Sequence, residues 1–145
     1  MKHTLVDTSV IVEYLKDNPR AVDLMAELLD EDSVLFINPA VFSEVFYVMM
    51  GHYFGKAPRT IKGKPEKLPE GLDTVFQILS DYAFVEITKE TTEIARDLIQ
   101  KYAMLPNDAL ILATCMEHGF SLATLDDDFK LPAGKEGVPL IGVRA

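Results

Sequence analysis

The chain alternates short apolar runs with helix-like segments, and this alternation restricts its fold more than any other feature. Apolar runs of strand length occur at residues 3–7, 33–37, 83–87, 120–124 and 139–143. The segments between them carry apolar residues at the three- and four-residue spacing of amphipathic helices. Strands separated by helices pair in parallel through right-handed crossovers. The sequence therefore predicts an α/β fold, a three-layer sandwich around a central parallel sheet of about five strands.

Residues that begin and end helices mark the segments between these strands. Asn38 followed by Pro39 predicts an N-cap with proline in the first helical position. Thr88 predicts the start of a helix that runs to about residue 102, and the helix expected over 106–118 ends at Gly119. A further helix is expected over about 69–81.

Length and composition point to one ordinary globular domain over residues 1–145. Of these residues 48% are hydrophobic and 26% are charged. No apolar run approaches the ~20 residues that span a bilayer, and Asp7 interrupts what would be the apolar part of a signal peptide. The single cysteine, Cys115, cannot form an internal disulfide and suits a reducing compartment. We therefore expect a cytoplasmic protein with no membrane partner.

Charge is unevenly distributed along the chain. The net charge of −9 argues against broad, nonspecific binding to nucleic acid. Within residues 52–67, however, five basic residues face only Glu66, a local net of +4 that leaves −13 for the remainder. Because residues 51–67 are rich in Gly, Pro and Lys, we expect a basic, flexible excursion, which is either a solvated loop or a guide for a polyanion. The candidate RNA-contacting residues in it are Lys56, Arg59, Lys62 and Lys64.

Four acidic residues lie at the edges of segments that otherwise favour burial. Asp7 ends the first apolar run, Glu44 lies within a helix-like apolar stretch, Asp108 opens an apolar helix, and Asp126 follows the fourth apolar run. A buried carboxylate is costly unless it is paired or binds a metal. In parallel sheets ligands bind beyond the carboxyl ends of the strands. A strand order of 3-2-1-4-5 would bring the first and fourth strands, and with them two of these acids, side by side.

Each acid taken singly also has a structural explanation. Asp7 could be an N-cap, Asp108 a helix-dipole acid, and Asp126 a turn residue. Glu44 is harder to explain, because its helical neighbours at three- and four-residue spacing are apolar or aromatic and no Lys or Arg occurs between residues 20 and 56. If the fold brings the four together, hard Mg²⁺ or Mn²⁺ ions would offset their mutual repulsion. Such ions activate water for attack on a phosphodiester and stabilise the leaving oxygen.

With these acids in this order, the chain resembles the PIN-domain ribonucleases, in particular the VapC-type toxins of prokaryotic toxin–antitoxin pairs. The segments LVDTSVIVEYL, FSEV, LPNDALILATCMEHG and LATLDDDF carry the resemblance, which extends over nearly the whole chain. The resemblance implies Mg²⁺- or Mn²⁺-dependent cleavage of RNA, a cognate antitoxin protein and a homodimer. It assigns Asp7, Glu44, Asp108 and Asp126 as catalytic metal ligands. It adds Ser9, Thr124 and Asp128 as secondary site residues.

Other functions explain these residues less well. A response-regulator receiver domain needs paired acids after its first strand, where only Asp7 stands, and a haloacid-dehalogenase phosphatase needs an acid at the position of Ser9. Two alternatives within the PIN fold stay open. One is a housekeeping RNA-processing nuclease, and the other is an interaction protein that has lost catalysis.

Overall fold

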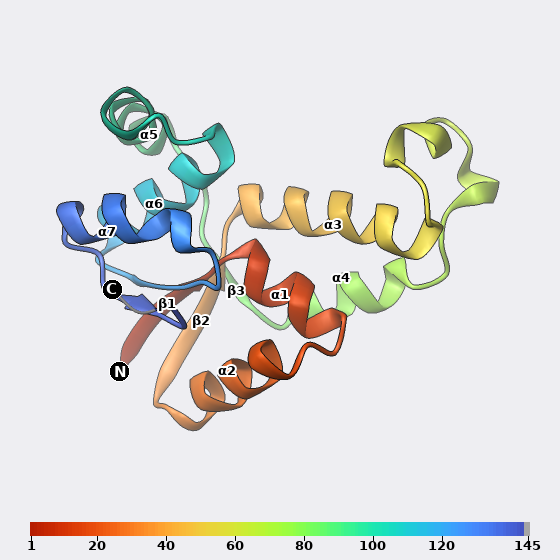
Figure 1. Cartoon of the computed structure of the whole chain (residues 1–145), viewed down its shortest axis with the longest axis horizontal. Helices are drawn as coiled ribbons and strands as arrows, with labels where there is room; N and C mark the ends of the chain where they lie inside the picture. The colour runs from red at the N-terminus through yellow and green to blue at the C-terminus, as the bar shows by residue number, and fades with distance from the viewer. Residues whose placement is uncertain (144–145) are drawn as a thin grey trace.

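A five-stranded parallel sheet forms the centre of the molecule (Figure 1). The computed structural model describes residues 1–143. The strand order β3-β2-β1-β4-β5 and the parallel pairing of all neighbours confirm the sequence prediction. The strands are β1 (Lys2–Val6), β2 (Ser33–Ile37), β3 (Ala83–Phe84), β4 (Ser121–Ala123) and β5 (Leu140–Ile141).

Helices cover both faces of this sheet and complete the three layers. The right-handed crossovers place α1 and α2 on one face and α5, α6 and α7 on the other (Figure 1). The α-helices are α1 (Thr8–Leu15), α2 (Pro19–Asp30), α3 (Pro39–Phe54), α4 (Leu72–Ser80), α5 (Lys89–Tyr102), α6 (Pro106–His118) and α7 (Lys130–Glu136). Three short 3₁₀ helices join them, η1 (Pro58–Ile61), η2 (Pro65–Lys67) and η3 (Asp127–Phe129).

The two edge strands are shorter than the sequence suggests, and β2 is more exposed. β3 and β5 contain two residues each, where the apolar runs predict five. β3 pairs only with Phe36 and Ile37, so the first half of β2 lies at an open edge. As a result only Ile37 of β2 is buried, and the other four residues of the strand are partly exposed.

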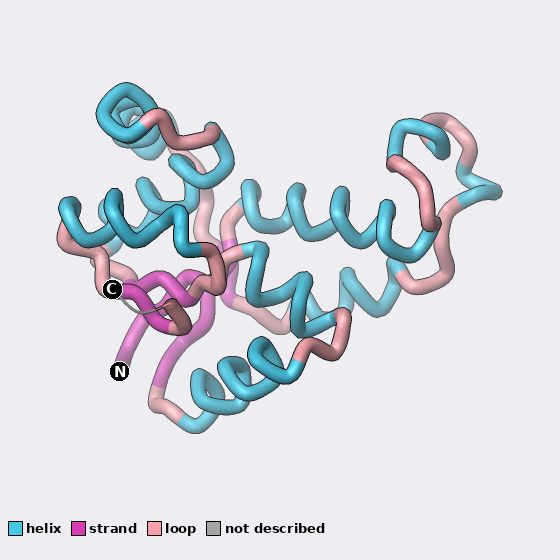
Figure 2. The backbone as a smooth tube through the Cα atoms, viewed as in Figure 1, coloured by secondary structure: helices cyan, strands magenta, loops and turns pink. Residues whose placement is uncertain are grey.

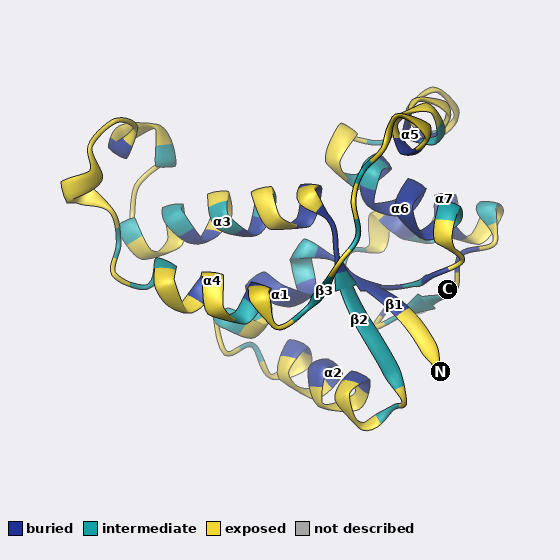
Figure 3. Cartoon of the chain, turned by 180° about the vertical axis from the view of Figure 1, so that it is seen from behind, coloured by how far each residue is buried: buried dark blue, intermediate teal, exposed yellow. Residues whose placement is uncertain are grey.

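The long helix α3 leaves the sheet together with α4 and forms an arm (Figure 2). Here the arm means α3, α4 and the intervening residues 55–71. The prediction of irregular chain from residue 51 was wrong for residues 51–54, which extend α3 until Gly55 ends it at φ 76°. The remainder of the excursion contains η1 and η2, and it is largely exposed apart from Ile61, whose side chain is buried (Figure 3).

The core lies between the sheet and its helices, with α6 buried on nearly all sides. Ala109, Ile111, Leu112 and Ala113 of this helix are fully buried. Cys115 is buried there too, and burial raises the pKa of its thiol, which makes it a structural rather than a reactive cysteine. Within residues 1–143, none of the helices has both the length and the apolarity needed to cross a membrane.

Candidate active site

The carboxyl ends of β1 and β4 bring two of the predicted acids together. Val6 pairs with Ala123, and the Asp7 amide donates to the Ala123 carbonyl at 2.9 Å. Helix α3 contributes Glu44 and helix α6 contributes Asp108 to the same edge of the sheet. A cavity of about 230 Å³ results, which we call the carboxylate pocket. It is lined by Asp7, Thr8, Ser9, Val12, Glu44, Val48, Asp108 and Asp126.

Two hydroxyl groups hold the Asp7 carboxylate in place. Ser9 Oγ and Thr124 Oγ1 both donate to Asp7 Oδ2, at 2.7 and 2.8 Å. The same hydroxyls accept backbone amides of the chain after β4, from Leu125 to Ser9 Oγ and from Asp126 to Thr124 Oγ1, each at 3.0 Å. The loop that carries Asp126 is therefore tied to Asp7. No side chain within residues 1–143 donates a hydrogen bond to Asp7 Oδ1.

Glu44 is fixed by the start of α1. Thr8 Oγ1 donates to Glu44 Oε1 at 3.1 Å, and the Asn107 side chain is a second hydrogen-bond partner. The carboxylate is half-buried, and its apolar helical neighbours Tyr47 and Val48 are exposed. The sequence argument that an apolar face means burial was therefore only partly right. What identifies Glu44 is its position at the pocket.

Burial raises the pKa values of three carboxyl groups of the pocket, and neighbouring carboxylates raise two of them further. Burial raises the pKa of Asp7 despite its hydrogen bonds to Ser9 and Thr124. Burial likewise raises the pKa of Glu44, and the nearby charge of Asp7 adds to this. The pKa of Asp108 rises to about 7, first through burial and then through four neighbouring carboxylates. These neighbours are Asp7, Glu44, Asp126 and Asp128.

The raised pKa of Asp108 also bears on the alternative that this residue only stabilises the N-terminus of α6 through the helix dipole. Asp108 does lie in the first turn of α6, where the dipole favours a negative charge. Its pKa is nevertheless raised, so burial and like charge outweigh the dipole. A divalent cation in the pocket would instead lower the pKa of Asp108, because it stabilises the ionised carboxylate.

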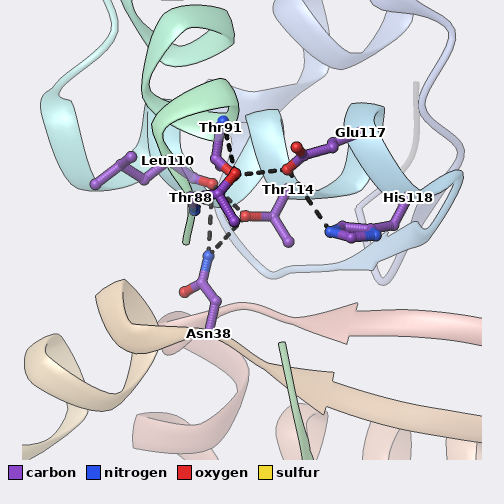
Figure 4. A network of polar contacts seen from close by, with 7 residues as sticks. All are labelled: Asn38, Thr88, Thr91, Leu110, Thr114, Glu117 and His118. Carbon is purple, nitrogen blue, oxygen red and sulfur yellow. Dashed lines mark hydrogen bonds and ion pairs between the residues drawn. The ribbon is translucent and has the colours of Figure 1, made fainter. Parts of the chain in front are cut away.

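A buried amide joins the helices that carry Glu44 and Asp108 (Figure 4). The side chain of Asn38 caps α3 by accepting from the Val41 amide at 3.0 Å. Its Nδ2 donates to Thr114 Oγ1 at 3.0 Å and to the Leu110 carbonyl at 3.4 Å, both in α6. The sequence predicted the cap but not this bridge, which we call the Asn38 clamp. About one turn farther along the same face of α6, Thr91 donates to Glu117 at 2.6 Å and ties α5 to this helix (Figure 4).

The structure does not bring every predicted residue to the carboxylate pocket. Asp128 lines a neighbouring cavity that shares Asp108 with it. Lys56, Arg59, Lys62 and Lys64 are exposed near the far end of the arm. Ten residues of α3 separate Glu44 from Phe54, about 15 Å at ~1.5 Å per residue. The basic residues therefore do not line the pocket of their own chain.

Sequence reasoning missed Thr8 and Asn107 as site residues. Each stands beside a predicted acid, Thr8 after Asp7 and Asn107 before Asp108, and this adjacency was the only available signal. Their common partner Glu44 is distant in sequence from both. Which side chain they meet therefore depends on how α1, α3 and α6 pack.

The donor set of the pocket fits a hard divalent cation bound with water. Its ionisable groups are all carboxylates, and none of its eight lining residues is basic. Within residues 1–143, no group of three or more His, Cys, Asp or Glu side chains is positioned to hold a metal ion by itself. Mg²⁺ retains several waters and is commonly held by one or two carboxylates together with substrate phosphate. An open, carboxylate-lined pocket suits that mode better than a closed structural site.

Comparison with known proteins identifies the family of the chain. The PIN-domain family profile matches residues 4–135. Ribonuclease VapC2 of Methanocaldococcus jannaschii is 34% identical over 126 residues, which cover 86% of this chain and 85% of that protein.

Solved structures share the fold at low sequence identity. A toxin–antitoxin complex from Klebsiella pneumoniae matches with a TM-score of 0.69 at 20% identity, covering 98% of this chain and 99% of that chain. The sarcin–ricin loop cleaving toxin VapC20 of Mycobacterium tuberculosis matches with a TM-score of 0.63 at 16% identity, covering 98% and 99%. Taken with the arrangement of acids at the carboxyl edge of the sheet, these matches show that the chain belongs to the PIN-domain family, among its VapC-type ribonucleases.

Proposed function

We propose that this protein is a metal-dependent endoribonuclease and the toxin of a toxin–antitoxin pair. One observation carries the proposal: four carboxyl groups from four separate segments line one pocket, with no basic lining residue to offset their charge. Burial is the main cause of the raised pKa values of Asp7, Glu44 and Asp108, and neighbouring carboxylates add to the rise at Glu44 and Asp108. Mg²⁺ or Mn²⁺ would offset the negative charge of the pocket.

The roles of the individual residues follow from their positions. Asp7 and Asp126 are the core ligand candidates, because β1 and β4 hold them on adjacent strands. Asp108 and Glu44 complete the set, directly or through water. Ser9 and Thr124 orient Asp7 so that Oδ1 stays available, and Asp128 is a reserve acid. A bound divalent cation would lower the pKa of an attacking water and neutralise charge on the phosphodiester.

The proposal is tested with variants that remove one charge and keep the local structure. Asp7→Asn and Asp126→Asn retain a side-chain oxygen at each N-cap, since Asn caps as well as Asp. We expect both variants to lose most RNA cleavage and to bind Mn²⁺ more weakly in calorimetry. Asp73→Asn is the matched control, an exposed acid in the first turn of α4. Wild-type rates for Asp7→Asn, with contamination excluded, would refute the assignment.

We propose that the antitoxin occupies an apolar groove between early helices. A cavity of about 450 Å³ lies beside the open half of β2, lined among others by Tyr14 of α1, Met25 and Leu29 of α2, and Ile78 of α4. Val12 of α1 and Met49 of α3 belong to the core and are not part of this groove. An antitoxin segment in this groove would lie beside α1, whose N-terminus carries Asp7.

Two further observations separate the toxin from its alternatives. Growth arrest when the chain is produced without its partner, with relief by a small protein encoded directly upstream, would support a toxin over a housekeeping nuclease. RNA cleavage that EDTA abolishes would exclude an inactive interaction protein. We also expect a cytoplasmic homodimer, which sedimentation of the purified protein tests for its oligomeric state.

A further inference from the structure

A second cavity adjoins the carboxylate pocket and shares Asp108 with it. Its volume is about 260 Å³. One wall is the connection between α5 and α6, residues 102–105, and the other consists of Phe129, Leu131 and Pro132. Asp108 and Asp128 lie between these walls in the lining. We call this cavity the flanking pocket.

Both walls are held by specific local structure. Ala103 ends α5 in the left-handed conformation, with φ 54°, which turns Met104 and Leu105 away from the helix axis. Tyr102 and Lys101, at the end of α5, both bind Glu136 of α7 through their hydroxyl and ammonium groups. These contacts join α7 to the end of α5, so the two walls are fixed relative to each other.

The walls of the flanking pocket are apolar, and its polar groups are hydrogen-bond acceptors. Leu105 and Leu131 are 72% and 62% exposed, so both expose apolar surface to water. The carboxylates of Asp108 and Asp128 accept hydrogen bonds. No Lys, Arg or His is among the lining residues. A ligand that fits has flat apolar faces and an edge rich in N–H donors.

We propose that the flanking pocket holds one base of the RNA next to the cleaved phosphate, and that it selects a base with an exocyclic amino group. This inference rests on the proposed nuclease function, because its location relative to the phosphate follows from the shared Asp108. Single-stranded bases are bound by contact with their faces and by hydrogen bonds to their edges. Adenine, cytosine and guanine each present an amino group to an acceptor. Uracil would turn two carbonyl oxygens toward the carboxylates.

The size of the flanking pocket agrees with this occupant. Its volume of about 260 Å³ is below the ~300–1,000 Å³ typical of sites for drug-sized ligands. A single base ring system suits it better than an extended ligand. Its continuity with the carboxylate pocket favours a segment of the substrate over an unrelated small molecule.

The test uses single-stranded RNAs in which each base beside the cleavage site is varied in turn among A, C, G, U and an abasic residue. Binding is measured with Ca²⁺ and cleavage with Mn²⁺. At one position we expect amino-bearing bases to bind about tenfold more tightly than the abasic residue, and uracil, which keeps the contact of its faces with the walls, to bind with intermediate affinity. Leu105→Ser and Leu131→Ser should each reduce that ratio below about threefold and leave affinity for the abasic RNA unchanged. Val22→Ser, an exposed apolar residue of α2, should retain the full ratio.

The outcomes separate this inference from the nuclease proposal. A base preference in binding that both serine variants reduce supports the flanking pocket, even if no RNA is cleaved and the nuclease proposal fails. Cleavage at equal rates with all four bases overturns the inference and leaves the nuclease standing. A ratio of amino-bearing to abasic binding that neither serine variant changes overturns it as well.

Discussion

Asp7 and Asp126 each combine a local structural role with a position at the pocket. Asp7 is the N-cap of α1, and the Asp126 side chain accepts from the Asp128 amide at the start of η3. Both roles arise because strands end, and helices begin, at the carboxyl edge of a parallel sheet. The structural and functional interpretations of these acids are therefore compatible.

This double role predicts different effects for two replacements of Asp7. Asp7→Ala removes the acceptor for Ser9 and Thr124, and we expect a loss of about 2 kcal/mol in the free energy of unfolding. Asp7→Asn keeps an acceptor and removes a buried charge, so without metal it should be at least as stable as wild type. Urea unfolding in EDTA measures both. Equal destabilisation by the two replacements would contradict the hydrogen-bond argument.

Asp108 predicts how the metal-free protein responds to pH. Its pKa of about 7 in the folded chain lies above the ordinary 3.8, so folding favours the protonated form. Unfolding free energy should therefore fall as pH rises from about 4 to 7, by about 1–2 kcal/mol once solvent screening of this partly exposed group is allowed for. Asp108→Asn should remove its share of the decline in urea unfolding with EDTA, and the raised pKa values of Asp7 and Glu44 account for the decline that remains. Asp73→Asn should retain the full decline, and an unchanged decline in Asp108→Asn would refute the argument.

The acids of the site could be predicted from sequence, whereas their partners could not. Asp7, Asp108 and Asp126 interrupt apolar segments, and the order of such residues is visible along the chain. The contact from Thr8 to Glu44 joins residues 36 positions apart and depends on the angle between α1 and α3.

At the scale of elements, capping residues located helix ends better than apolar runs located strand ends. Asn38, Thr88 and Gly119 lie where predicted, because a cap acts on the adjacent turn. The ends of β3 and β5 depend on how much of a neighbouring strand is available for pairing. That information is absent from the local sequence.

The Asn38 clamp predicts coupling between α3 and α6. Asn38→Ser keeps a capping oxygen but removes the bridge to Thr114, so we expect a loss of about 1–2 kcal/mol in unfolding free energy and weaker Mn²⁺ binding. A double-mutant cycle with Thr114→Val provides the control. The two stability losses should be less than additive, since they remove one shared contact. Additive losses, or unchanged Mn²⁺ affinity in Asn38→Ser, would show that the clamp does not position the carboxylates.

At the scale of the whole molecule, the basic residues that could bind RNA are separated from the carboxylates that could take part in its cleavage. The carboxylate pocket lies at the carboxyl ends of β1 and β4, and the basic residues belong to the connection between α3 and α4, which forms the far end of the arm (Figure 1). A single chain would have to bind RNA at both places. In the homodimer that we propose, the arm of one chain could instead approach the pocket of the other.

This separation predicts a salt dependence that varies with RNA length. Changing Lys56, Arg59, Lys62 and Lys64 together to Gln should weaken binding and reduce the slope of log affinity against log salt by about 2–3, at ~0.7 per phosphate contact. The distance of about 15 Å from Glu44 to the end of α3 corresponds to roughly four stacked nucleotides at ~3.4 Å each. A trinucleotide should therefore show little difference between the variant and wild type.

A matched control separates this local effect from net charge. Changing Lys2, Lys89, Arg96 and Lys135 to Gln removes the same charge from exposed positions outside the arm. If RNA reaches the arm, only the arm variant should show a smaller slope of log affinity against log salt. The difference should appear only with RNA long enough to span both regions. Equal slopes for the two variants would mean that overall charge governs binding. The excursion would then be a solvated connection between α3 and α4, which is the simpler of the two readings its composition allows.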